Sequence, residues 1–332
     1  MLRKRFLSLT CALVLCLSLL PVTALAEGTA PQTLYVGSTT ISAGYWTSSD
    51  GGTTWARQEN QPEGNNYIYY DGQGTLKLHN ATIQRGSITG SAPFGSGIYA
   101  LSSSNQPVAL TIELIGKNTI TGNYGIYVDA QQGGTVGTNA SLLIQNSDDD
   151  GSLEVSGSSY GIYVKSGTGN ASLTIKDASV VASCCSSYGS YAGVCVHSGS
   201  DATSSPKLSL AVDGGSLTTS ASKGNDGIQF YVGANGVTSE TTSLSVTNNA
   251  IVDARNGGIR ASGVSVNPNV NIGSTDSTSG IVFDGTEGTV YGNVELQKDL
   301  EIKSGETLTI PEGSTLNTNN NLTNNGTIVN TG

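Results

Sequence analysis

A tetrad of Gly, then Ile or Val, then a variable residue, then an apolar residue recurs along the chain and constrains its fold more than any other feature. Its seven copies begin at Gly97, Gly125, Gly161, Gly193, Gly227, Gly258 and Gly280, and successive copies lie 22 to 36 residues apart. Self-similarity at such a period is typical of solenoids. Apolar residues at the second and fourth positions give the alternation of a strand with one buried face. We therefore predict that each tetrad is the last strand of a solenoid coil.

Two shorter strands are expected before each tetrad. In one repeat, Leu142-Leu143-Ile144 opens the coil, an acidic turn follows, and Leu153-Glu154-Val155 forms the second strand. Three strands and three corners per coil predict an all-β fold, a right-handed parallel β-helix. Ile98, Ile126 and Ile162 should then stack in one narrow core. Because core strands must stay in register, the differences in repeat length should fall in the corners.

Residues 1–26 have the pattern of a secretory signal peptide. Arg3-Lys4-Arg5 supply the positive start, Phe6 to Leu20 the apolar segment, and Ala24-Leu25-Ala26 a small-x-small cleavage site. An apolar run of about 15 residues is short for a membrane span. We expect a protein that is secreted and extracellular, with no membrane insertion after cleavage.

The rest of the chain divides by composition into an N-terminal cap (27–75), a parallel β-helix (76–288) and a short-period tail (289–332). The cap segment holds both tryptophans, Trp46 and Trp55. They either help to cover the open end of the first coil or form a platform for stacking carbohydrate.

In the tail, apolar residues recur every six to eight positions, which predicts tighter coils on the same axis. Because this pattern is still running at Gly332, we expect either that the sequence is a piece of a longer protein or that an open last coil near Asn319-Asn320-Asn321 associates with another chain.

The charge of the chain argues against nucleic acid as a partner. The net charge is −10, and loss of the three basic residues of the signal peptide makes it −13. An acidic surface repels phosphate backbones and anionic membranes.

Several segments carry a resemblance to a known group of proteins. They are Thr33 to Gly37, Tyr45-Trp46, Gly74 to Ile83 and Leu110 to Gly122. Together they resemble exported β-helix surface proteins of gut Firmicutes, which are described as carbohydrate-binding-domain or adhesin-like proteins. The tail from residue 300 is similar to the short repeats of large bacterial surface proteins. The resemblance implies a place at the bacterial cell surface and a non-catalytic role, either in binding polysaccharide or as an adhesin-like rod.

The variable third residues of the tetrads give the candidate ligand site. In a solenoid, Tyr99, Tyr127 and Tyr163 would stack on the outer face. The same column would continue through Cys195, Gln229, Arg260 and Val282. Exposed tyrosine rings offer apolar faces with polar tips, so we hypothesise a site for polysaccharide or a host or cell-surface glycan. The alternative is an aromatic stack that only stabilises neighbouring strands, in a stalk with no sugar affinity.

Calcium is the one cofactor that the sequence suggests. Asp148, Asp149 and Asp150 precede Gly151, as in the first half of an EF-hand loop, but Gly157 stands where that loop needs Glu. A looser calcium site on this corner and a solvated acidic turn both remain open.

Three cysteines remain after the signal peptide. A disulfide between Cys195 and either Cys184 or Cys185 would be permitted in an exported protein, and free thiols are the alternative.

Parallel β-helices also include pectate-lyase-like polysaccharide lyases and hydrolases, so an enzyme is a second alternative. Glycoside hydrolysis needs two paired carboxylates, and no sequence motif here supplies them. Asp253, Arg255 and Arg260 form a cluster that is more typical of surface ion pairs. No Gly-x-Ser-x-Gly motif is present. We expect no catalytic residues.

Overall fold

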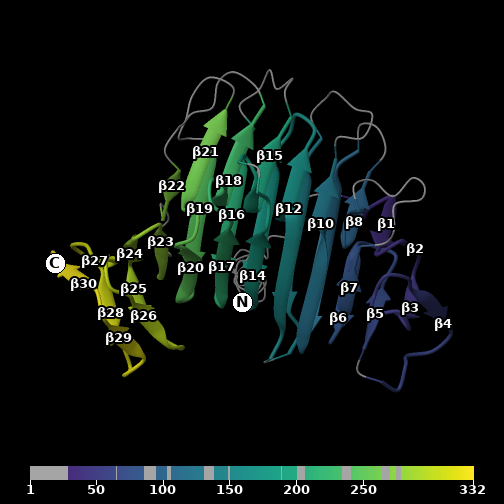
Figure 1. Ribbon diagram of the computed structural model, residues 1–332, viewed down its shortest axis with the longest axis horizontal. Helices are drawn as coiled ribbons and strands as arrows, with labels where there is room; N and C mark the ends of the chain where they lie inside the picture. The colour runs from purple at the N-terminus through teal and green to yellow at the C-terminus, as the bar shows by residue number, and fades with distance from the viewer. Residues whose placement is uncertain are drawn as a thin grey trace, which may run out of the picture.

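The computed structural model describes residues 29–332 except 65, 86–94, 103–105, 131–137, 149, 188, 200–205, 234–240, 264–269 and 274–277. Within this part of the chain every helix or strand element is a β-strand, which confirms the all-β prediction. The strands follow one another along the long axis in chain order (Figure 1). The predicted signal peptide at 1–26 lies outside the described residues.

One sheet carries the first strand of each coil. Its strands are β6 (Thr75–His79), β9 (Val108–Ile115), β11 (Ala140–Asn146), β13 (Ala171–Lys176), β16 (Leu208–Asp213), β19 (Thr242–Thr247) and β22 (Asn271–Ile272). Neighbouring strands pair parallel and in register. The leucines that open the coils therefore form one buried column, as expected. Its members are Leu110, Leu142, Leu173, Leu210 and Leu244.

The second sheet carries the other two strands of each coil. Its coil strands are β7 (Thr82–Gln84), β8 (Ile98–Leu101), β10 (Lys117–Asp129), β12 (Ser152–Ser166), β14 (Ser179–Cys184), β15 (Ala192–Ser198), β17 (Ser216–Ala221), β18 (Asp226–Val232), β20 (Ala250–Ala254), β21 (Ile259–Gly263) and β23 (Gly280–Asp284). β10 and β12 are long enough to supply both strands of their coil without a break. Ile98, Ile126 and Ile162 pair in register and are 0% exposed, so their predicted stack is confirmed.

Antiparallel strands lie at the N-terminal end of both sheets. β1 (Thr33–Val36) pairs with β2 (Thr39–Ile41) and with β8. β3 (Gly44–Thr47) pairs with β4 (Ala56–Gln58) and β5 (Tyr67–Tyr70), and β5 pairs with β6.

Trp46 and Trp55 are buried in the core at this end. Their indole N–H groups donate to the carbonyls of Ser42 (3.0 Å) and Gly52 (3.1 Å). The hypothesis of an exposed carbohydrate platform at these tryptophans is therefore wrong, because both rings fill the core beneath the antiparallel strands.

The tail begins with a reversal of direction. β24 (Glu287–Tyr291) folds back antiparallel on β23. The remaining strands are β25 (Asn293–Glu295), β26 (Leu300–Ile302), β27 (Thr307–Ile310), β28 (Thr315–Asn317), β29 (Leu322–Asn324) and β30 (Thr327–Asn330). They pair parallel in three columns, with partners 20 to 22 residues apart. The tail thus has parallel columns with a shorter repeat than the body, and its column β24–β27–β30 runs opposite to β23.

β23 separates two cores. Val282 pairs with Val252 and packs into the main core, whereas Ile281 and Phe283 face the other side and pack with Val290 in a second core. The last tetrad thus lies in the second-strand column, on β20. The prediction that Val282 follows Arg260 in the tyrosine column is wrong, because β21 is not the partner of β23.

Candidate functional site

The outer face of the third-strand column carries the predicted row of side chains. The in-register pairs place Tyr99, Tyr127, Tyr163, Cys195, Gln229 and Arg260 at successive positions across β8, β10, β12, β15, β18 and β21. A second row runs two residues further along each strand. It contains Asp129, Lys165, His197, Tyr231 and Ser262.

The three tyrosines are not exposed. Tyr99, Tyr127 and Tyr163 are 2%, 4% and 7% exposed and belong to a cluster separate from the main core. Tyr124 stacks on Tyr127 with ring centres 4.9 Å apart, and Tyr160 stacks on Tyr163 at 4.5 Å. The hypothesis of an open ladder is therefore wrong, because a second layer of rings covers it. The repeated Tyr-Gly-Ile-Tyr sequence at 124–127 and 160–163 was the signal that the sequence reasoning missed.

The hydroxyl groups of the three tyrosines form hydrogen bonds with polar side chains of the second row. Tyr99 and Tyr127 both donate to Oδ2 of the buried Asp129, at 3.1 and 3.0 Å. The Tyr163 hydroxyl shares a hydrogen bond with Nδ1 of His197. Burial and then the Asp129 charge raise the pKa of Tyr127 far above its usual value. Burial and then the Lys165 charge lower the pKa of His197 to about 3. At neutral pH this cluster therefore holds neutral phenols and a neutral imidazole.

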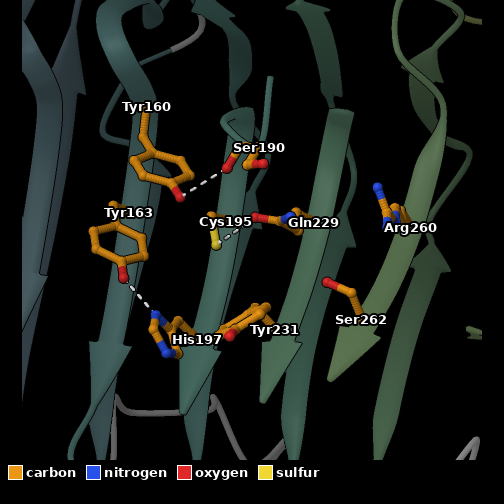
Figure 2. A pocket seen from close by; sticks show the side chains of 9 residues that line it. All are labelled: Tyr160, Tyr163, Ser190, Cys195, His197, Gln229, Tyr231, Arg260 and Ser262. Carbon is orange, nitrogen blue, oxygen red and sulfur yellow. Dashed lines mark hydrogen bonds between the residues drawn. The ribbon is translucent and has the colours of Figure 1, made fainter. Parts of the chain in front are cut away.

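A cavity of about 400 Å³ opens where the tyrosine cluster ends. Figure 2 shows its lining side chains projecting from four neighbouring strands, β12, β15, β18 and β21, except Ser190, which lies in the segment before β15. They are Tyr160, Tyr163, Ser190, Cys195, His197, Gln229, Tyr231, Arg260 and Ser262. Rings of Tyr160 and Tyr163 bound one side, and Arg260 and Ser262 bound the other. Its volume lies within the range of about 300–1,000 Å³ that is usual for small-molecule sites.

Hydrogen bonds fix the polar side chains at the centre of the cavity. Cys195 Sγ lies 3.5 Å from Gln229 Oε1, and Gln229 Nε2 donates to Asp226 Oδ2 at 3.2 Å. The Cys195 thiol is fully buried on its strand, and burial raises its pKa well above the usual value. It is therefore a protonated thiol at neutral pH and a poor nucleophile.

The predicted disulfide is absent, and Cys184, Cys185 and Cys195 are all free thiols. Cys195 faces outward on β15, whereas Cys184 lies at the end of β14 and points its Sγ to the carbonyl of Ser159, 2.9 Å away. Cys185 is exposed. The prediction of a bond to Cys195 is wrong because these thiols lie in different strand columns.

The calcium prediction stays a prediction. Asp148 and Asp150 are exposed, and Asp148 Oδ1 accepts the Asp150 backbone N–H at 3.3 Å, while Asp149 lies outside the described residues. Within the described residues, no group of three or more His, Cys, Asp or Glu side chains is arranged to hold a metal ion.

Comparison of the chain with protein-family models, with curated proteins and with solved structures gave no match in any of the three. The part of the chain that the structure describes contains no α-helix that could span a lipid bilayer.

Proposed function

We propose that the protein is a secreted, surface-associated, non-catalytic glycan-binding β-solenoid, and that the cavity beside the tyrosine cluster is its binding site. In this proposal the body is a right-handed parallel β-helix with three strands per coil. The in-register parallel columns support that architecture, and strand crossovers in one sheet are right-handed in nearly all proteins.

The single observation that carries the function is the lining of the cavity. Aromatic rings of Tyr160 and Tyr231 are half-buried there, so part of each ring is accessible. Gln229, Ser262 and Ser190 bring amide and hydroxyl groups to the same space. A sugar ring has apolar C–H faces and hydroxyl edges, so an aromatic wall with polar groups opposite matches both. The Firmicutes resemblance points in the same direction.

The site is also pre-formed. Tyr160 is held against Tyr163 by nearly parallel stacking (8° between ring planes), and its hydroxyl donates to the Ser190 carbonyl at 3.3 Å. A ring fixed in this way loses little freedom when a ligand binds, which favours affinity.

The test is affinity electrophoresis and calorimetry against a panel of soluble polysaccharides with wild type, Tyr160→Ala and Tyr231→Ala. We expect retention by at least one polysaccharide, and a loss of about 10-fold or more in affinity for each variant, since one aromatic contact contributes on the order of 1.5 kcal/mol. Tyr45→Ala, which removes a tyrosine ring on β3, is the matched control. No retention of the folded wild type by any polysaccharide would refute the proposal.

A structural rod is the second candidate, and one observation favours it. β30 pairs with β27 on one side only among the described strands, and Val329 on β30 is 39% exposed. A free strand edge with an apolar side chain can pair with a second copy. Light scattering across a concentration series, with Val329→Lys as the disrupting variant, tests this.

Catalysis receives no support from the cavity. None of its nine described lining residues is a carboxylate, whereas glycoside hydrolysis needs two. A reducing-sugar assay in parallel with the binding experiment would detect an activity.

A further inference from the structure

We propose that the cavity selects glycans that carry a carboxylate, such as a uronic acid residue, and that Arg260 is the group that recognises it. This inference rests on the proposed glycan-binding function and names the class of ligand.

Arg260 is placed to meet a ligand rather than to stabilise the fold. Its side chain is 54% exposed and bounds the cavity opposite the tyrosine rings (Figure 2). The nearest acidic partner among the described residues is Asp226, whose Oδ1 lies 4.0 Å from Nη1, at the outer limit of an ion pair. The guanidinium is therefore not engaged in the two-pronged contact that it makes with a well-placed carboxylate.

The Asp226 carboxylate is held elsewhere. It is largely buried, and its Oδ2 accepts the Gln229 amide at 3.2 Å. Because Gln229 is in turn contacted by Cys195, this network keeps Asp226 turned toward the sheet. A ligand carboxylate can then approach the exposed side of Arg260 without displacing an existing strong pair.

Arg260 presents a positive charge at the cavity although the protein as a whole is acidic. Arg260 is the one charged residue among the nine that line the cavity, and His197 is neutral at pH 7. Lys165 pairs in register with His197 and its charge acts on both His197 and Cys195, so a second cation faces this surface. Two carboxylates lie close to these cations, Asp226 beside Arg260 and Asp129 in register with Lys165. Each is engaged by neighbouring side chains, Asp226 by the Gln229 amide and Asp129 by the Tyr99 and Tyr127 hydroxyls, so the exposed Arg260 guanidinium is the charge that a ligand meets.

The neutral lining supplies the remaining contacts. Ser262 and Gln229 flank Arg260 on β21 and β18, and Tyr231 lies beside Ser262 in register. Hydroxyl and amide groups next to a cation suit a sugar ring whose carboxylate replaces one hydroxymethyl group. A fully neutral sugar would gain no charge-assisted hydrogen bond from Arg260, whereas a carboxylate would.

The experiment compares two ligands that differ in whether their carboxylates are free or methyl-esterified: oligogalacturonate and its fully methyl-esterified form, measured by calorimetry at pH 7 with a calcium chelator present. We expect wild type to bind oligogalacturonate more tightly than the ester, on the order of 10- to 100-fold. Arg260→Gln should remove this preference. Arg260→Lys should retain part of it, because lysine keeps the positive charge but lacks the planar guanidinium that binds a carboxylate through two hydrogen bonds. Raising salt should weaken binding of the acid form but not of the ester.

Lys298→Gln is the matched control, since it removes one exposed positive charge from the tail, away from the cavity. Equal affinity of wild type for the acid and its ester, or an unchanged preference in Arg260→Gln, would overturn the inference while leaving glycan binding intact. If folded wild type binds no glycan of the broader polysaccharide panel, the proposed function itself fails.

Discussion

The guanidinium carbon of Arg255 lies 3.7 Å from the centre of the Phe283 ring. Arg255 also contacts Asp253 Oδ2 at 2.7 Å, and its Nε lies 3.1 Å from Glu306 Oε2 without hydrogen-bond alignment. A further hydrogen bond of 2.9 Å reaches the carbonyl of Glu301. One side chain thus joins the last coils of the body to the first coils of the tail.

Arg255→Met should lower the free energy of unfolding by about 2–4 kcal/mol. The change leaves the carboxylates of Asp253 and Glu306 partly buried without their cation, which costs more than the pair itself contributes, and it removes the cation–π contact. Urea denaturation measures the loss, and limited proteolysis shows whether the tail opens first. Lys298→Met, at an exposed position, is the control and should change stability by less than about 0.5 kcal/mol. Equal stability of the two variants would contradict this role of Arg255.

Ile126→Ala should lower the free energy of unfolding by about 2–5 kcal/mol, because it opens a cavity in the middle of the isoleucine stack. Ile126→Val should cost only about 0.5–1.5 kcal/mol. The measurement is chemical denaturation followed by circular dichroism. Val181→Ala also shortens an aliphatic side chain, but one that is 39% exposed, and it should be nearly neutral. If Ile126→Ala lowered the free energy of unfolding no more than Val181→Ala does, Ile126 would not lie in a stacked core.

The tyrosine cluster should make the protein sensitive to alkali. Burial raises the pKa of Tyr99, Tyr127 and Tyr163 above the ordinary 10.0 in the folded state only. Their contribution to stability is therefore complete below pH 10 and is lost as the pH rises above it, because the unfolded chain releases protons that the folded chain keeps. Each such phenol adds a slope of about 1.4 kcal/mol per pH unit.

The urea midpoint between pH 8 and 11.5 measures this slope. Tyr163→Phe should reduce the slope by the contribution of one phenol, about 1.4 kcal/mol per pH unit. Tyr45→Phe, at a tyrosine outside the cluster, should leave the slope unchanged. A midpoint in wild type that does not move above pH 10 would argue against a buried cluster.

Thiol titration distinguishes the free cysteines from the disulfide that the sequence suggested. In protein that begins at residue 27, one thiol, the exposed Cys185, should react with an aromatic disulfide reagent under native conditions. Cys184 and Cys195 should react only after unfolding, since both are buried and burial raises the pKa of each thiol. Cys185→Ser should abolish the native reaction. A total of one thiol in denaturant would indicate a disulfide.

Much of the architecture follows from the sequence because a single property, the alternation of apolar residues, fixes it. Gly125-Ile126 and Gly161-Ile162 pair in register because a slip of one residue would turn every isoleucine to the outside. The same alternation occurs in second and third strands alike, so it could not show that the Gly280 tetrad pairs with β20.

The candidate site was predictable only in part. Alternation correctly put Tyr127 and Tyr163 on the outer face, but it carries no information about what lies above that face. Their cover comes from Tyr124 and Tyr160, which the irregular register near Gly122 turns outward. The cavity itself combines four residues of the predicted column with Tyr160, Ser190, His197, Tyr231 and Ser262. That those five residues meet at the cavity depends on how neighbouring strands are spaced in the folded protein, which alternation along a single strand does not show.

β23 is apolar on both sides because it serves two interiors, with Val282 in one and Phe283 in the other. Body and tail are consequently not independent modules that could be exchanged or trimmed like ordinary repeats. A chain cut after residue 286 would expose Ile281 and Phe283 to water as an apolar surface that favours aggregation. The solubility of the body therefore depends on the strands that follow it.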